Sequence, residues 1–230
     1  MKKLNLLLAL VLLGGASNLF AQADTKEVVA MIKKNLVDSK EKMKLYEWVE
    51  TTTVFVKGEQ KSVKQKQCYY SLDGKLTKVE TGGSEDAKKP GGIRGKVAEN
   101  KKEDMTEYMK QAVDKILTYL PPDPDKIQQI YAAGKISIQV LEPNNKFKLG
   151  FPDYNEAGDL LSISINKPAQ KIMAVDVTTS VDKPDEKVVF NITYKDLPDG
   201  TQYAASTVLD AKAKDLKIVI ENSGFKHASK

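Results

Sequence analysis

The second half of the chain alternates between apolar and polar residues with a period of two. This period is typical of β-strands that have one face in a core and one face in water. Prolines, glycines, asparagines and aspartates interrupt the alternation at short intervals, as turn residues do. The pattern predicts an antiparallel meander of seven short strands. They are expected over residues 136–140, 147–151, 161–165, 172–177, 188–194, 202–209 and 216–220.

The first half begins with a helical pattern and continues with three more strands. Apolar residues at helical spacing predict a helix over residues 24–43. A run rich in threonine, valine and aromatic residues predicts a strand over residues 46–56. Asp73-Gly74 is a hairpin signal between two further strands, which are expected over residues 62–72 and 75–80.

Two helices are expected between the two groups of strands. Residues 105–120 carry an apolar stripe at helical spacing, which Pro121-Pro122 terminates. A shorter helix follows, with Asp123 as its N-cap, Pro124 at its first position and Gly134 at its C-terminal end.

Residues 81–100 are expected to form the longest irregular segment, because glycine and proline cluster there. Arg94, the only arginine of the chain, lies in this segment. The segment is either a lid that carries this guanidinium or a solvated loop.

The order helix, three strands, two helices, seven strands predicts an α+β fold. We expect one large curved antiparallel sheet, an incomplete β-barrel, with the helices packed on its concave face.

The N-terminus has the three parts of a secretory signal peptide. Met1-Lys2-Lys3 is positive, residues 4–13 are largely apolar, and Ala21-Gln22-Ala23 is an A-x-A cleavage site. We expect residues 1–23 to be removed after Ala23 and residues 24–230 to form a single exported domain, periplasmic or secreted. The apolar run is about half of the ~20 residues that a membrane span needs, and no transmembrane segment is expected in the mature chain.

Composition argues against several partners and chemistries. The formal net charge of +5 falls to +3 when Lys2 and Lys3 leave with the signal peptide, too weak a balance for a nucleic-acid partner. The single cysteine, Cys68, rules out an internal disulfide framework and is expected to be buried and inert.

Catalytic and metal-binding constellations are not evident in the sequence. The only histidine, His227, lies three residues from the C-terminus, in a tail that we expect to be frayed. We therefore predict no catalytic residue, no metal site and no cofactor, and a protein that is not an enzyme. The remaining acids near Pro and Gly are expected to form turns; they are Asp182, Asp185, Asp196 and Asp199.

An apolar stripe on the helix over residues 105–120 is the main candidate for binding. Such a stripe packs on a sheet, and methionines on it can also line an adaptable apolar pocket. The candidate cavity-lining residues are Trp48, Met105, Tyr108, Met109, Val113, Ile116 and Phe190.

Several segments resemble the LolA/LolB-like superfamily of periplasmic lipoprotein carriers, the outer-membrane lipoprotein-sorting proteins. The segments are Tyr46–Thr52, directly after the first helix, then Tyr69–Lys75, Val188–Tyr194, Leu197–Thr201 and Leu216–Ile220. The resemblance covers most of the mature chain as an order of elements. It implies a half-barrel lidded by helices that holds acyl chains in the apolar space between them.

The family's carriers have a functional arginine on an early strand, where this chain has Lys57, Lys61 and Lys64. A relative that binds another lipid, or an envelope sensor, fits the resemblance equally well.

Three functions follow, in this order of preference. The first is a non-enzymatic binder or carrier of an apolar ligand, such as a lipid, an acyl chain or an acylated protein, in the cell envelope. The second is an envelope protein-interaction or sensor module that binds a protein partner through a sheet edge or through residues 81–100. The third is a carboxylate-based hydrolase, which needs two acids that converge in a cleft.

Overall fold

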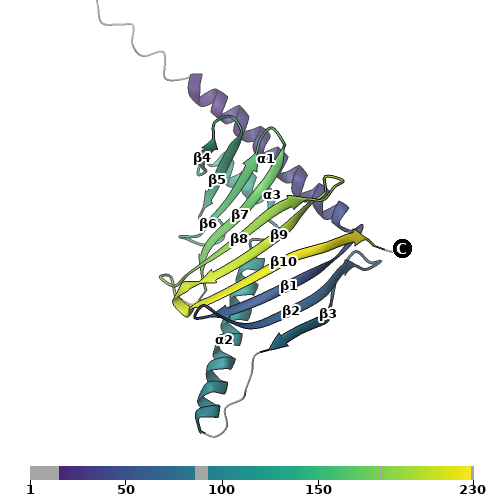
Figure 1. Ribbon diagram of the computed structural model, residues 1–230. Helices are drawn as coiled ribbons and strands as arrows, with labels where there is room; N and C mark the ends of the chain where they lie inside the picture. The colour runs from purple at the N-terminus through teal and green to yellow at the C-terminus, as the bar shows by residue number, and fades with distance from the viewer. Residues whose placement is uncertain (1–15, 86–92, 182, 229–230) are drawn as a thin grey trace, which may run out of the picture.

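The computed structural model describes residues 16–85, 93–181 and 183–228. Ten antiparallel strands form one sheet, and three α-helices accompany it in this described part (Figure 1). The helices are α1 (Ala16–Met43), α2 (Ile93–Leu117) and α3 (Pro124–Ala132). The strands are β1 (Tyr46–Val56), β2 (Glu59–Tyr70), β3 (Leu76–Glu85), β4 (Ser137–Glu142), β5 (Lys146–Pro152), β6 (Leu160–Asn166), β7 (Lys171–Ser180), β8 (Lys187–Asp196), β9 (Gln202–Ala211) and β10 (Leu216–His227).

The order of strands in the sheet is β3-β2-β1-β10-β9-β8-β7-β6-β5-β4. The predicted meander, β4 to β10, is present in full, and the first strand joins it by pairing with the last, with Val54 opposite Ile218. Because β3 and β4 are the two ends of this order, the sheet is open. The α+β fold with an incomplete barrel is therefore confirmed.

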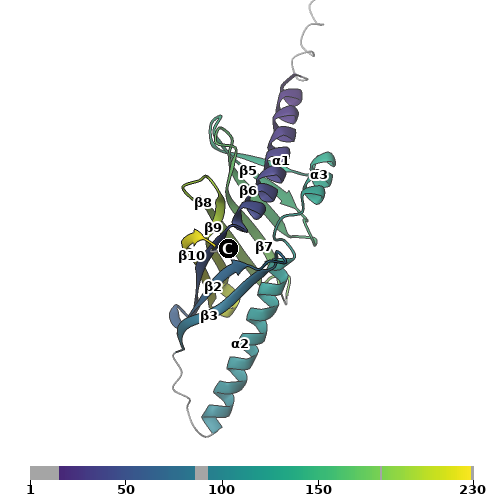
Figure 2. The ribbon, with the colours of Figure 1, turned by 90° about the vertical axis from the view of Figure 1, so that its right-hand side faces the viewer.

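One face of the sheet carries all three helices, and we call it the helix-bearing face (Figures 1 and 2). The main core lies between the three helices and the sheet. Burial of its side chains removes apolar surface from water and so stabilises the fold. Its members include Val29 and Ile32 of α1, Tyr108, Ala112 and Ile116 of α2, Ile127 of α3, and Leu161, Ile163, Val175, Val177, Val188 and Phe190 of the sheet.

The segment that contains α2 and α3 connects the two edges of the sheet. It leaves β3 at one edge and enters β4 at the other, so it must cross the helix-bearing face. The N-terminal half of α2 extends past the ends of the strands (Figure 2). As predicted, Asp123 caps α3, since its carboxylate accepts hydrogen bonds from the amides of Asp125 and Lys126.

The predicted irregular segment over residues 81–100 is wrong at both ends. β3 continues to Glu85, and α2 already begins at Ile93, so Arg94 lies in a helix. Two of the glycines that suggest a loop, Gly82 and Gly83, are strand residues. A Cβ on Gly83 would lie 2.5 Å from the carbonyl oxygen of Val63 on β2. Glycine here permits close approach of two backbones.

The prediction of a frayed tail at His227 is also wrong. His227 is the last residue of β10, paired with Tyr46 at the start of β1, and the two rings stack with their centroids 4.5 Å apart. The predicted cleavage site at Ala23 lies within α1, and Asp182 lies outside the described residues. No helix in the described part of the chain is long and apolar enough to cross a membrane.

Candidate ligand-binding face

The apolar stripe of α2 is wider than the part of it that is buried. Tyr108, Ala112 and Ile116 are buried against the sheet. A helix turns about 100° per residue, so Met109, Val113 and Leu117 form the next row round its surface. Met109 is half-buried, whereas Val113 and Leu117 are 41% and 60% exposed. We call this row the open flank of α2.

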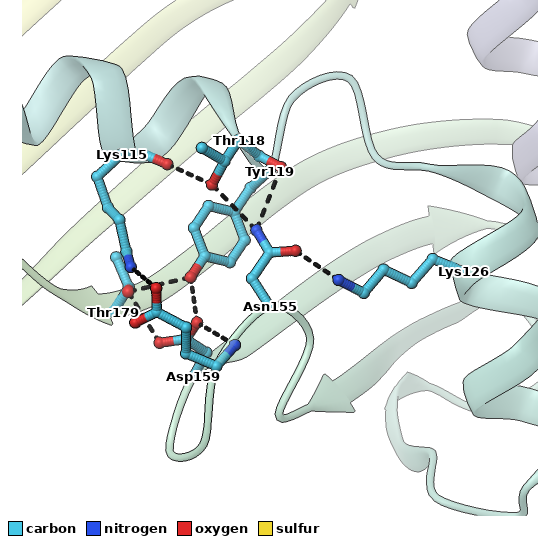
Figure 3. A network of polar contacts seen from close by, with 8 residues as sticks. Lys115, Thr118, Tyr119, Lys126, Asn155, Asp159 and Thr179 are labelled. Atoms are coloured by element: carbon cyan, nitrogen blue, oxygen red, sulfur yellow. Dashed lines mark hydrogen bonds and ion pairs between the residues drawn. The ribbon is translucent and has the colours of Figure 1, made fainter.

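The other flank of α2 is polar and fixed to the loop between β5 and β6 (Figure 3). Lys115 forms an ion pair with Glu156, and the side-chain amide of Asn155 donates to the carbonyl and hydroxyl oxygens of Thr118. Asn155 in turn accepts from Lys126 of α3. These contacts set the rotation of α2 about its axis, so the open flank faces away from this loop.

A buried polar cluster fixes the residues that follow α2. The hydroxyl of Tyr119 and the hydroxyl of Thr179 both donate to Asp159, and the backbone amide of Glu156 donates as well (Figure 3). Burial, followed by the hydrogen bond to Asp159, raises the pKa of Tyr119 well above its ordinary value. The cluster satisfies all three donors within the protein, which is the behaviour of a structural anchor.

The sheet contributes half-buried apolar residues to the helix-bearing face near its first strand. Val54 and Val56 of β1 and Ile220 of β10 pack against the core without being fully covered. They share one face because Val54 pairs with Ile218 and Thr52 pairs with Ile220. Together with the open flank of α2 they make up what we call the candidate face.

A charge pair lies on the same face of β1, beyond the valines. Glu50 is only 7% exposed, and its carboxylate lies 2.5 Å from the ammonium of Lys78 on β3. Glu50 shares a face with Val54 because successive side chains along a strand alternate. The apolar part of this face therefore ends at an ion pair.

The predicted cavity-lining residues fall into three groups. Tyr108, Ile116 and Phe190 lie within the core. Met105 and Met109 pack against the core and are half-buried, and Val113 is exposed.

Trp48 lies apart from the core in an aromatic cluster of its own. Its ring stacks on Phe225 and lies 6.1 Å from Tyr70, and its indole N–H donates to Asn222. The structure thus brings the α2 residues together and places Trp48 elsewhere.

Three members of the candidate face, Leu117, Val54 and Val56, are not among the residues predicted from the sequence. Leu117 continues the spacing of Met109 and Val113, so the helical pattern contained the signal. Val54 and Val56 share the even positions of β1 with Trp48, but only strand pairing shows which face carries the helices.

A hollow of about 610 Å³ lies at the tips of the β1–β2 and β9–β10 hairpins. None of the residues that line it comes from α2, and its charges are mixed. They are Phe55, Lys57, Gly58, Asp210, Lys212, Asp215, Leu216 and Lys217.

The thiol of Cys68 and the carboxylate of Asp199 are both engaged in the structure of the fold. Cys68 is buried, as predicted, and burial raises the pKa of its thiol, which favours the neutral and unreactive form. Asp199 accepts from the amide and hydroxyl of Thr201 in the β8–β9 turn, as a turn-forming acid does. In the described residues, no group of three or more histidine, cysteine or acidic side chains is placed to hold a metal ion.

Comparison with known proteins identifies no family for this chain. No protein-family model matches the chain, and no curated protein matches it. The crystal structure of a DUF1329 family protein from Desulfovibrio piger ATCC 29098 matches with a TM-score of 0.39 and 7% sequence identity, over 88% of this chain and 92% of that chain. A likeness this weak carries no argument about family or function.

Proposed function

We propose that this chain is an exported, non-enzymatic carrier or binder of an apolar ligand, of the LolA-like kind, which acts in the cell envelope after residues 1–23 are removed. The ligand is a lipid, an acyl chain or an acylated protein. The observation that supports this proposal is the open flank of α2. Val113 and Leu117 leave apolar surface uncovered, and the helix-bearing face of the sheet carries half-buried apolar residues. Apolar surface left exposed in this way is a candidate binding site.

Burial of acyl surface would supply the binding free energy. Each methylene removed from water contributes about 0.8 kcal/mol, so a chain of ten methylenes contributes about 8 kcal/mol before the entropic cost of binding. Met105 and Met109 beside the open flank suit acyl chains of different shape, because the methionine side chain is unbranched and flexible.

Binding without covalent chemistry is consistent with the surroundings of the acids near the turns. Asp196 pairs with Lys171, and Asp199 is held by Thr201 and Tyr46. Acids that are each engaged in local structure support binding over carboxylate-based hydrolysis.

Uptake of the fluorescent apolar probe N-phenyl-1-naphthylamine tests the site. We expect the wild-type chain to bind the probe and Val113→Glu to weaken binding about tenfold or more, because a charge in the apolar contact must be desolvated. Val189→Glu is the matched control: Val189 is also 41% exposed, but it alternates with the core residues Val188 and Phe190 and so lies on the other face of β8.

The variants distinguish the outcomes. Probe binding by Val189→Glu together with loss in Val113→Glu supports the candidate face. No uptake by the wild-type chain, or equal loss in both variants, would overturn the proposal.

A further inference from the structure

The two edges of the sheet differ in how they are protected against pairing with another strand. At one edge, β3 carries Lys78 and Glu80, both exposed, followed by Gly82 and Gly83. Its pairing with β2 is irregular near these glycines, between Gln65 and Lys66. Charges and bulges are among the devices by which natural edge strands avoid association.

The other edge carries no charge along its exposed length, and its irregular pairing with β5 lies only at its end, between Val140 and Glu142. Residues 137–141 of β4 read Ser-Ile-Gln-Val-Leu, without charge, glycine or proline, and all five are exposed. Ile138 and Val140 are 49% and 57% exposed. They pair with Leu149 and Phe147 of β5, and Leu149 is a core residue, so both point to the helix-bearing face. An uncharged, apolar edge strand is a template for a further strand.

We propose that β4 pairs antiparallel with β4 of a second copy of this chain, so that two sheets join into one across a twofold axis. With Gln139 on the axis, Ile138 of each copy lies opposite Val140 of the other. Both pairs then lie on the helix-bearing face, where apolar cross-strand pairs stabilise a sheet. This surface is separate from the candidate face and does not depend on the proposed ligand.

The pattern of apolar residues favours a second copy over another partner. Ile138 and Val140 are equidistant from Gln139, so each meets the other across the axis and the contact occurs twice. Glu142, which ends the strand, already pairs with Lys146 of its own chain, so the stretch that meets the second copy, residues 137–141, is uncharged. The strand is therefore complementary to itself, as a twofold interface requires.

Disulfide trapping tests the register directly. Residues directly opposite each other in an antiparallel pair have Cα atoms about 4.5–5.5 Å apart, within the range for a disulfide. Gln139→Cys should therefore give a covalent dimer on mild oxidation. Ser137→Cys is the matched control on the same strand, because its two copies would be about 13 Å apart along the strands. The parent chain, whose Cys68 is buried, is the blank.

Light scattering after size-exclusion chromatography tests the association itself. We expect a dimer that Val140→Lys weakens about tenfold or more, because the new charge enters the symmetric interface twice. Val189→Lys, at an exposed residue of the interior strand β8, should leave the dimer unchanged. A monomer at every concentration, or equal cross-linking of Ser137→Cys and Gln139→Cys, would overturn the inference.

Discussion

The phenol of Tyr119 donates a hydrogen bond to the buried carboxylate of Asp159. Tyr119 is the second residue after α2, and Asp159 precedes β6, so this bond joins the helix end to the sheet. Together with the contacts of Lys115 and Thr118, it fixes which side of α2 faces solvent. The direction of the open flank therefore follows from a polar anchor at one end of the helix.

Removal of Asp159 should destabilise the fold more than removal of the Tyr119 hydroxyl. Asp159→Ala leaves two buried hydroxyls and the amide of Glu156 without their acceptor and should lower the free energy of unfolding by about 3 kcal/mol. Tyr119→Phe leaves the other two donors paired and should cost about 1–2 kcal/mol. Urea denaturation followed by circular dichroism measures both.

The matched control is Tyr69→Phe, at a half-buried tyrosine of β2. It should change the free energy of unfolding by less than about 0.5 kcal/mol. Equal losses for Tyr69→Phe and Tyr119→Phe would show that the cluster anchors nothing.

Stability should fall in acid partly through Asp199. The amide of Thr201, followed by the phenol of Tyr46, lowers the pKa of Asp199 from 3.8 to about 2. Because the folded state holds this proton less tightly than the unfolded chain does, the stabilisation is complete above pH 4 and is lost as the pH falls toward 2.

Urea midpoints measured between pH 2 and pH 4.5 test this contribution. Asp199→Asn should show a shallower fall than the wild-type chain over this range. Tyr46→Phe should lie between them, since it removes the phenol donor and leaves the amide of Thr201 in place. A fall in Asp199→Asn as steep as in the wild-type chain would contradict the assignment.

The ion pair of Glu50 and Lys78 should respond unequally to loss of its partners. Glu50 is buried, whereas Lys78 is exposed. Lys78→Met leaves a buried carboxylate without its cationic partner. It should lower the free energy of unfolding by about 1–3 kcal/mol, measured by urea denaturation. Glu50→Gln keeps a polar group opposite an ammonium that water can reach, and should cost less. The reverse order would show that the carboxylate is solvated.

The sheet could be predicted from the sequence because its signals are local. Alternation marks each strand of the meander, and Asp123 with Pro124 marks the start of α3. The pairing of β1 with β10 was not predictable in this way, because it joins residues from opposite ends of the chain, such as Tyr46 and His227. The same pairing orders His227, which the sequence alone places in a tail.

The candidate site was predictable only in part, for a related reason. Helical spacing identified Met105, Met109 and Val113, but not which of them would be covered. Coverage depends on the rotation of α2, which is set by residues distant in the chain: Asp159, just before β6, and Thr179 of β7. Gly83 was misassigned because close approach of β2 and β3, rather than a turn, requires its small size.

Native mass spectrometry of the chain, expressed with its own N-terminal segment and purified without detergent, shows whether the mature protein carries a lipid. We expect a mature mass that begins at Asp24 and carries an additional lipid mass. The lipid mass should be lost in Val113→Glu and kept in Val189→Glu. A clean mass without ligand, which stays unchanged when phospholipid or acylated peptide is added, would contradict the proposal that this protein is a carrier.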